Sequence, residues 1–228
     1  MGATPAGNIQ NSDDIFLRLT HFIDTASATS RFLIVGTSLG AYLGRALTNK
    51  YSEQVDGLLL RVPLIRAGKR DFDPFQRLLL ELFAMAATPE TQQALLETIL
   101  IQTPEYISKL QTKFDQAVSP ALKAADNVIL DRIRSDELRY RLSPQYDAGN
   151  NKSHDPTLVL TARQDDAVGH RDWLSLLELC PRSTYAILDR ATHVMPLDDQ
   201  AVFEALVKKR LSRPLEWQET RAVPVIGH

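Results

Sequence analysis

A short apolar run that leads directly into a Gly-x-Ser-x-Gly pattern places the strongest constraint on how this chain folds. Residues 32–35 are apolar and few enough to form a strand buried on both faces, and Gly36-Thr37-Ser38-Leu39-Gly40 follows at once. Apolar residues then recur at helical spacing as far as Asn49. A strand, a sharp turn and a helix form the context in which a serine hydroxyl is held out of a sheet, next to backbone N–H groups. Ser38 is therefore a candidate nucleophile.

The alternative interpretation of this pattern is an ordinary turn between a strand and a helix. A bare Gly-x-Ser-x-Gly arises by chance about once in ten or more sequences of this length, so the flanking strand and helix carry the prediction. We expect both Gly36 and Gly40 to be needed, because a strained turn and close helix packing leave no room for side chains.

Composition indicates one soluble globular domain and points to no macromolecular partner. The 228 residues carry a formal net charge of -2, with Lys and Arg spread along the chain. No basic patch predicts nucleic-acid binding, no long apolar span predicts membrane insertion, and the N-terminus lacks a signal-peptide core. The single cysteine, Cys180, fits a reducing compartment and is interpreted as a buried thiol without a catalytic role. We expect a cytoplasmic protein that acts on a small molecule.

Strands and helices are expected to alternate along most of the chain. A helix capped by Asn11 or Ser12 comes first, with an apolar face formed by Ile15, Phe16, Leu19, Phe22 and Ile23. Further buried strands are expected at 55–62, 157–161 and 184–188, and further helices at 173–179 and 200–211. Two apolar strands separated by a helix predict parallel pairing with a right-handed crossover. The fold class is therefore α/β with a parallel sheet.

Residues 70–142 differ from the rest because they contain helix starts and no expected strands. The helix starts, each a capping residue followed by proline, are Asp73-Pro74, Thr88-Pro89, Thr103-Pro104 and Ser119-Pro120. The sequences between them do not resemble one another, which favours a helical insertion over a repeat. We assign residues 1–69 and 143–212 to an α/β core, residues 70–142 to a helical cap and residues 213–228 to a tail.

Polar clusters follow the third and fourth expected strands. Asp165 and Asp166 come after one, and His193 comes after the other. Because the carboxyl ends of parallel strands open on one edge of a sheet, Ser38, Asp165 and His193 are expected to converge. Their order, Ser-Asp-His, is that of hydrolases with a nucleophile elbow. Asp166 remains the alternative acid, and the alternative for His193 is a loop histidine with structural hydrogen bonds only.

Other titratable residues near these positions are interpreted without a catalytic role. His21 shares the polar face of the first helix, and His154 and His170 have no evident partner, so all three are expected at the surface. Asp198 and Asp199 are interpreted as charges in the first turn of a helix.

These motifs resemble the α/β-hydrolase fold family, as a serine hydrolase with a helical cap inserted between two strands of the core. Residues 36–40 match the family's elbow, residues 164–168 its acid loop and residues 191–193 its histidine loop, with Thr192 where the family usually has glycine. The resemblance covers nearly the whole chain but starts late. The expected core is N-terminally short, because the family's early strands and the His-Gly loop that supplies one oxyanion N–H would precede Met1.

The resemblance implies that Ser38 is the nucleophile, His193 the base and Asp165 the residue that orients the imidazole, with the backbone N–H of Leu39 as one oxyanion donor. It implies a serine hydrolase that cleaves an ester, thioester or amide through an acyl-enzyme, without metal or cofactor. Carbon–carbon bond hydrolysis and peptidase activity are alternatives on the same triad. The alternative class is a non-catalytic or truncated hydrolase-like protein without a complete oxyanion hole. In such a protein the strand at 31–36 would have an unpaired edge, which predicts self-association.

Overall fold

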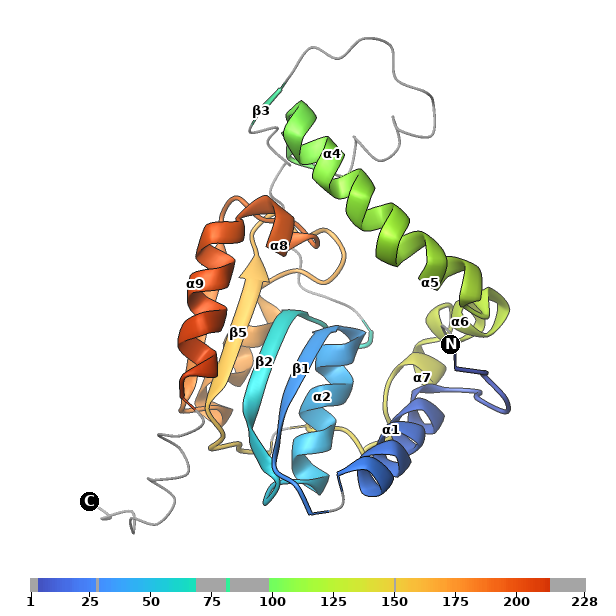
Figure 1. Ribbon diagram of the computed structural model, residues 1–228. Helices are drawn as coiled ribbons and strands as arrows, with labels where there is room; N and C mark the ends of the chain where they lie inside the picture. Colours follow the sequence, from blue (N-terminus) through green and yellow to red (C-terminus); the bar gives the residue numbers. More distant parts are fainter. Residues whose placement is uncertain (1–3, 28, 69–80, 83–98, 150, 214–228) are drawn as a thin grey trace, which may run out of the picture.

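A parallel sheet of four strands forms the centre of the computed structural model, which describes residues 4–27, 29–68, 81–82, 99–149 and 151–213 (Figure 1). The strands, in spatial order, are β1 (Phe32–Ser38), β2 (Val55–Pro63), β5 (Thr157–Ala162) and β6 (Ser183–Leu188). Val35 pairs with Leu59 of β2, and Leu60 pairs with Val159 of β5. The predicted α/β fold with a parallel sheet is confirmed, and each expected strand lies within a few residues of its predicted range.

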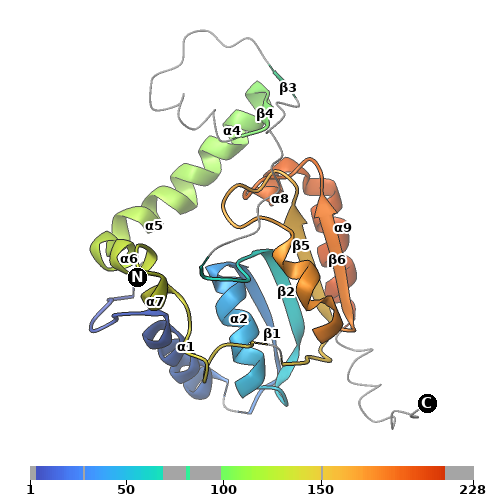
Figure 2. The ribbon, with the colours of Figure 1, turned by 180° about the vertical axis from the view of Figure 1, so that it is seen from behind.

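Helices cover both faces of this sheet. α2 (Leu39–Lys50) packs on β1 and β2, and the absence of a side chain at Gly44 lets α2 approach Ile34 closely. α9 (Gln200–Leu211) packs on the opposite face, where its Arg210 reaches Gly57 of β2. The inner strands β2 and β5 are almost completely buried between the two layers. β6 lies at the far edge of the sheet from β1 (Figure 2).

The first helix, α1 (Ser12–Ala26), lies beside α2 and starts with a capping box. Asn11 accepts a hydrogen bond from the backbone N–H of Asp14, so Asn11, one of the two predicted caps, fills that role. Ser12 instead donates to the carbonyl oxygen of Tyr140, 2.7 Å away. The predicted apolar face is buried at Ile15 and Phe16, but Phe22 is exposed because no neighbouring element reaches it in the part of the chain described.

A run of helices extends from α4 (Pro104–Lys113), near α8 (Met195–Asp198), to α7 (Glu137–Tyr140), beside α1 (Figure 1). α4, a π-helical turn (Phe114–Val118) and α5 (Ser119–Ala124) are continuous, and α6 (Asn127–Arg134) and α7 follow. Thr103 caps α4 as predicted. The predicted helix start at Ser119-Pro120 is wrong, because the backbone is already helical before Ser119 and the serine side chain caps nothing.

Two further differences concern local structure in and after this helical region. β3 (Glu81–Leu82) pairs with β4 (Ile101–Gln102), so the region predicted to lack strands contains a short parallel pair. Residues 172–179 form a 3-10 helix where an amphipathic α-helix was predicted. The predicted starts at 73–74 and 88–89 lie outside the described residues, and the division into core, cap and tail stays a prediction.

β1 forms an edge of the sheet as far as the chain is described. Val35 in its centre points away from α2 and is 66% exposed. Self-association through this edge stays a prediction. Within the described ranges, none of the helices has the length and apolar character needed to cross a membrane.

Candidate active site

Ser38 occupies a strained turn at the carboxyl end of β1. Its φ of 52° and ψ of -120° lie outside the regions that L-residues ordinarily adopt, and α2 begins at the next residue, Leu39. The turn is held on one side by a hydrogen bond of 3.2 Å from the backbone N–H of Leu64 to the carbonyl oxygen of Ser38. The predicted strand, sharp turn and helix around the serine are therefore present.

The two glycines of the pattern have different roles. A Cβ at Gly36 would lie 2.5 Å from the carbonyl oxygen of Gly40 and 2.6 Å from Cα of Ala41, so Gly36 permits the close approach of α2 to its own strand. A Cβ at Gly40 would meet nothing within 4 Å. The prediction that packing requires both glycines is wrong at Gly40, because that residue lies on an exposed side of the first turn of α2.

The first turn of α2 presents backbone N–H groups beside Ser38. The first N–H groups of a helix have no partner within it, and the Ser38 side chain caps none of those in α2. The Leu39 N–H follows the nucleophile directly, which is the position of one oxyanion donor in a nucleophile elbow. The geometry is compatible with the predicted role of Leu39.

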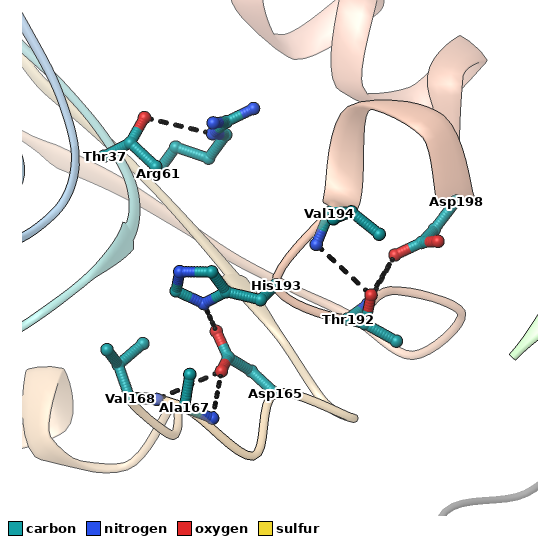
Figure 3. Close-up of polar contacts among 9 residues, drawn as sticks. All are labelled: Thr37, Arg61, Asp165, Ala167, Val168, Thr192, His193, Val194 and Asp198. Atoms are coloured by element: carbon teal, nitrogen blue, oxygen red, sulfur yellow. Dashed lines mark hydrogen bonds and ion pairs between the residues drawn. The ribbon is translucent and has the colours of Figure 1, made fainter. Parts of the chain in front are cut away.

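Asp165 and His193 form a hydrogen-bonded pair. His193 Nδ1 lies 2.9 Å from Asp165 Oδ2, and Asp165 Oδ1 accepts hydrogen bonds from the backbone N–H groups of Ala167 and Val168, 2.8 Å and 3.0 Å away (Figure 3). The Asp165 side chain is fully buried, whereas that of His193 is 34% exposed. With Nδ1 facing the carboxylate, Nε2 is the ring nitrogen left for a substrate or nucleophile.

Backbone hydrogen bonds join the loops that carry this pair. The N–H of Arg163 donates to the carbonyl oxygen of Leu188 at 2.9 Å, and the N–H of Gln164 donates to that of Ala191 at 3.0 Å. Asp166, the alternative acid, is exposed and makes no hydrogen bond to His193. The acid loop and the histidine loop therefore leave the sheet together at the carboxyl end of adjacent strands.

The structure places Ser38 at the same edge of the sheet as the Asp165–His193 pair, but Ser38 and His193 are not hydrogen-bonded in the described part of the chain. Catalytic hydrogen bonds are often long in unliganded enzymes and shorten when a substrate binds. The arrangement therefore supplies a paired acid and imidazole and a strained serine, with the last contact of a triad left open.

Two residues near the site are buried and hydrogen-bonded in ways that the sequence did not indicate. Asp198 ends α8 (Met195–Asp198) and is buried, and its Oδ2 accepts hydrogen bonds from the N–H and hydroxyl of Thr192, 2.6 Å and 2.7 Å away. It lies in the first turn of a helix as predicted, but its carboxylate also binds the histidine loop. His170 is also buried rather than at the surface, and its carbonyl oxygen accepts from Tyr185 at 2.5 Å. Neither contact has a local sequence signal, because each partner is brought close only by the fold.

Arg61 is a further residue that sequence analysis missed. It lies at the carboxyl end of β2, and its Nε donates to Thr37 Oγ1 at 3.1 Å, one residue before Ser38 (Figure 3). Burial lowers the pKa of its guanidinium below the ordinary arginine value. Arg61 thus places a half-buried cation beside the turn.

Two other histidines and the single cysteine were predicted to have no catalytic role. His21 and His154 are exposed, as predicted. Cys180 is a free, half-buried thiol, and burial raises its pKa. No group of three or more His, Cys, Asp or Glu side chains in the described residues is arranged to hold a metal ion.

The sequence matches the model of a family described as "Serine aminopeptidase, S33" over residues 4–200. No curated protein matches it.

Solved structures with this fold include several hydrolases. An α/β superfamily hydrolase from Oenococcus oeni PSU-1 has a TM-score of 0.78 and 20% identity, over 91% of this chain and 76% of that chain. A serine hydrolase involved in carbazole degradation has a TM-score of 0.60 and 19% identity, over 92% and 74%. A thermophilic esterase from Thermogutta terrifontis has a TM-score of 0.54 and 15% identity, over 91% and 74%. At these identities the likeness concerns the fold.

Proposed function

This chain belongs to the serine aminopeptidase S33 family of α/β hydrolases, and from this premise we propose that it is a serine hydrolase with Ser38, His193 and Asp165 as its catalytic triad. The observation that carries the proposal is the strained serine at the same sheet edge as a histidine hydrogen-bonded to a buried aspartate. A positive φ at a serine between a strand and a helix is costly, and such strain is typical of active sites.

The proposed chemistry gives each residue of the triad one role. Ser38 Oγ attacks a substrate carbonyl carbon while His193 Nε2 takes the hydroxyl proton, and the Leu39 N–H stabilises the negative charge on the carbonyl oxygen. His193 then gives the proton to the leaving group, which departs and leaves an acyl group on Ser38. Water, activated by His193, hydrolyses this acyl-enzyme. Asp165 holds the imidazole with Nε2 free to accept and stabilises it when charged.

Carboxylic esters, thioesters and amides are the proposed substrate class. The family description names an aminopeptidase and the neighbours of this fold include an esterase, so both ester and peptide amide bonds belong in a first screen. Carbon–carbon bond hydrolysis is a less direct alternative on the same triad. A cytoplasmic location and a small-molecule substrate are further proposals, supported by the single free cysteine and the absence of a basic patch in the sequence.

Labelling of the purified chain with a fluorophosphonate probe tests this proposal. The probe forms a covalent bond to an activated serine, and mass spectrometry of the digested protein locates the adduct. We expect labelling at Ser38 and its loss in both Ser38→Ala and His193→Ala. His154→Ala is the matched control, because His154 is an exposed histidine with no contact to the site, and it should be labelled like the wild type.

Absence of labelling in a folded, monomeric wild-type protein would contradict the proposal. That outcome would favour a non-catalytic hydrolase-like protein that retains the fold and the Asp–His pair without a working oxyanion hole. Circular dichroism and thermal denaturation of each variant would show that the loss of labelling does not come from unfolding.

A further inference from the structure

The histidine loop is anchored to a buried carboxylate through Thr192, the residue that precedes His193. Asp198 Oδ2 accepts from the N–H and the hydroxyl of Thr192, and the Thr192 hydroxyl oxygen accepts from the N–H of Val194 at 3.2 Å (Figure 3). The residues before and after His193 are therefore tied to the end of α8. Hydrogen bonds in such a buried environment are electrostatically stronger than in water.

The same carboxylate is also bound by a residue from the helical region. The hydroxyl of Tyr106 on α4 donates to Asp198 Oδ1, and both side chains are buried. α4 also packs on α8, so the contact is part of a packed interface rather than an isolated bond. Burial and the adjacent carboxylate raise the pKa of Tyr106, which keeps its hydroxyl protonated and able to donate at neutral pH. Asp198 thus joins α4 to the histidine loop.

We propose that Asp198 and Tyr106 are positioning residues that fix the histidine loop, and that they make the placement of His193 dependent on α4. This inference rests on the proposed role of His193 as the base. Asp165 and Asp198 have complementary tasks: Asp165 contacts the imidazole and orients the ring, whereas Asp198 binds Thr192, the residue before His193, and so holds the backbone of the loop. Misplacement of a catalytic group by about 1 Å can cost roughly 100-fold in rate, so anchoring of the loop matters for proton transfer.

Thr192 has a specific role in this arrangement. Its hydroxyl both donates to Asp198 and accepts from Val194, so it completes the link across His193. A glycine at this position would retain the backbone bond to Asp198 but would lose both hydroxyl contacts. Because the hydroxyl makes both contacts, we expect serine at this position to keep the loop anchored and valine to release it.

Saturation kinetics of fluorophosphonate labelling at Ser38 test the proposal, because they separate the maximal labelling rate from the affinity for the probe. Tyr106→Phe and Thr192→Val should lower the maximal labelling rate constant by about tenfold, with the probe concentration for half-maximal rate changed less than about twofold. Thr192→Ser should restore most of the rate. Tyr51→Phe is the matched control, because the Tyr51 hydroxyl donates to Asp24 and to the carbonyl oxygen of Thr20, at the far end of α2. It should lose stability but label like the wild type.

Amide hydrogen exchange of residues 190–195 gives a readout that needs no activity. Below the unfolding transition, exchange in this loop should be faster in Tyr106→Phe and unchanged in Tyr51→Phe. Unaltered loop exchange in Tyr106→Phe would overturn the inference even if the serine proved unreactive. A labelled wild type with an unaltered maximal rate in Tyr106→Phe and Thr192→Val would also overturn it while leaving the proposed function intact. If the wild type is not labelled but exchange in the loop is faster in Tyr106→Phe, the proposed function is contradicted and the anchoring of the loop by Tyr106 is supported.

Discussion

The Asp165 carboxylate lies between His193 and its own loop, with Oδ2 at 2.9 Å from the imidazole Nδ1 and Oδ1 bound by two backbone N–H groups. Each of the two carboxylate oxygens therefore has its own hydrogen-bonding partners, one on the imidazole and one on the loop backbone. The neighbouring Asp166 has the same chemistry, but its side chain is exposed and the carboxylate bonded to His193 is that of Asp165. The fold therefore shows which of the two adjacent aspartates is the partner of His193, a choice that the sequence did not decide.

Asp165→Asn should abolish most of the reactivity of Ser38. The amide can offer one oxygen acceptor only, so either the loop N–H groups or the His193 Nδ1–H loses its partner and the imidazole tautomer is no longer fixed. We expect labelling by a fluorophosphonate to slow by roughly 10³-fold or more. Asp166→Asn is the matched control and should label within about twofold of the wild type. Equal losses in the two variants would show that Asp165 is not the orienting acid.

Gly36 and Gly40 should respond in opposite ways to the same substitution. Gly36→Ala forces a Cβ against the backbone of α2, which has no flexible side chain to move aside, so we expect a loss of about 1–3 kcal/mol in the free energy of unfolding. Gly40→Ala adds a methyl group to open space in a helix and should be neutral or stabilising by up to about 1 kcal/mol. Chemical denaturation of both variants measures the difference. Equal destabilisation would mean that the turn, not packing, requires both glycines.

Arg210 should contribute to stability through buried hydrogen bonds rather than through the dipole of α9. Its Nε donates to the carbonyl oxygen of Leu58 at 3.1 Å, and its guanidinium occupies the space that a side chain at Gly57 would fill. Arg210→Met should lower the free energy of unfolding by about 1–3 kcal/mol, because a buried acceptor loses its donor. Lys209→Met, an exposed cation in the same helical turn, should change it by less than about 0.5 kcal/mol. Similar effects would point to helix–dipole stabilisation instead.

The four strands of the main sheet and the elbow could be predicted because their signals are local. An apolar run such as residues 158–160, between Thr157 and Thr161, is typical of a short buried strand, and the position of Ser38 follows from the strand before it and the helix after it. Convergence of Asp165 and His193 at one edge followed from a general property of parallel sheets.

The contact between α4 and the end of α8 could not be predicted because it joins residues distant in sequence. Tyr106 is separated from Asp198 by 92 positions, and nothing near either residue indicates the other. Burial of Asp198 likewise depends on how α4 packs on α8. A proline after a hydroxyl residue is a local signal, yet it failed at Ser119 because a preceding helix simply continued through it.

The exposed edge of β1 gives the last prediction. Among the described strands β1 pairs on one side only, and Val35 presents an apolar side chain there, so backbone N–H and C=O groups and an apolar surface are offered together. A second copy of the chain that adds its own β1 would satisfy both. We therefore expect concentration-dependent association of the wild type in sedimentation velocity experiments.

Val35→Lys should shift this association toward the monomer, because a charge at the centre of an edge strand opposes strand addition. Val128→Lys is the matched control: Val128 is 79% exposed on α6, so the substitution adds the same charge away from the sheet and should leave the association unchanged. A wild type that stays monomeric over the whole concentration range would show that this edge is not an association surface. Equal effects of the two lysines would assign the association to net charge rather than to strand pairing.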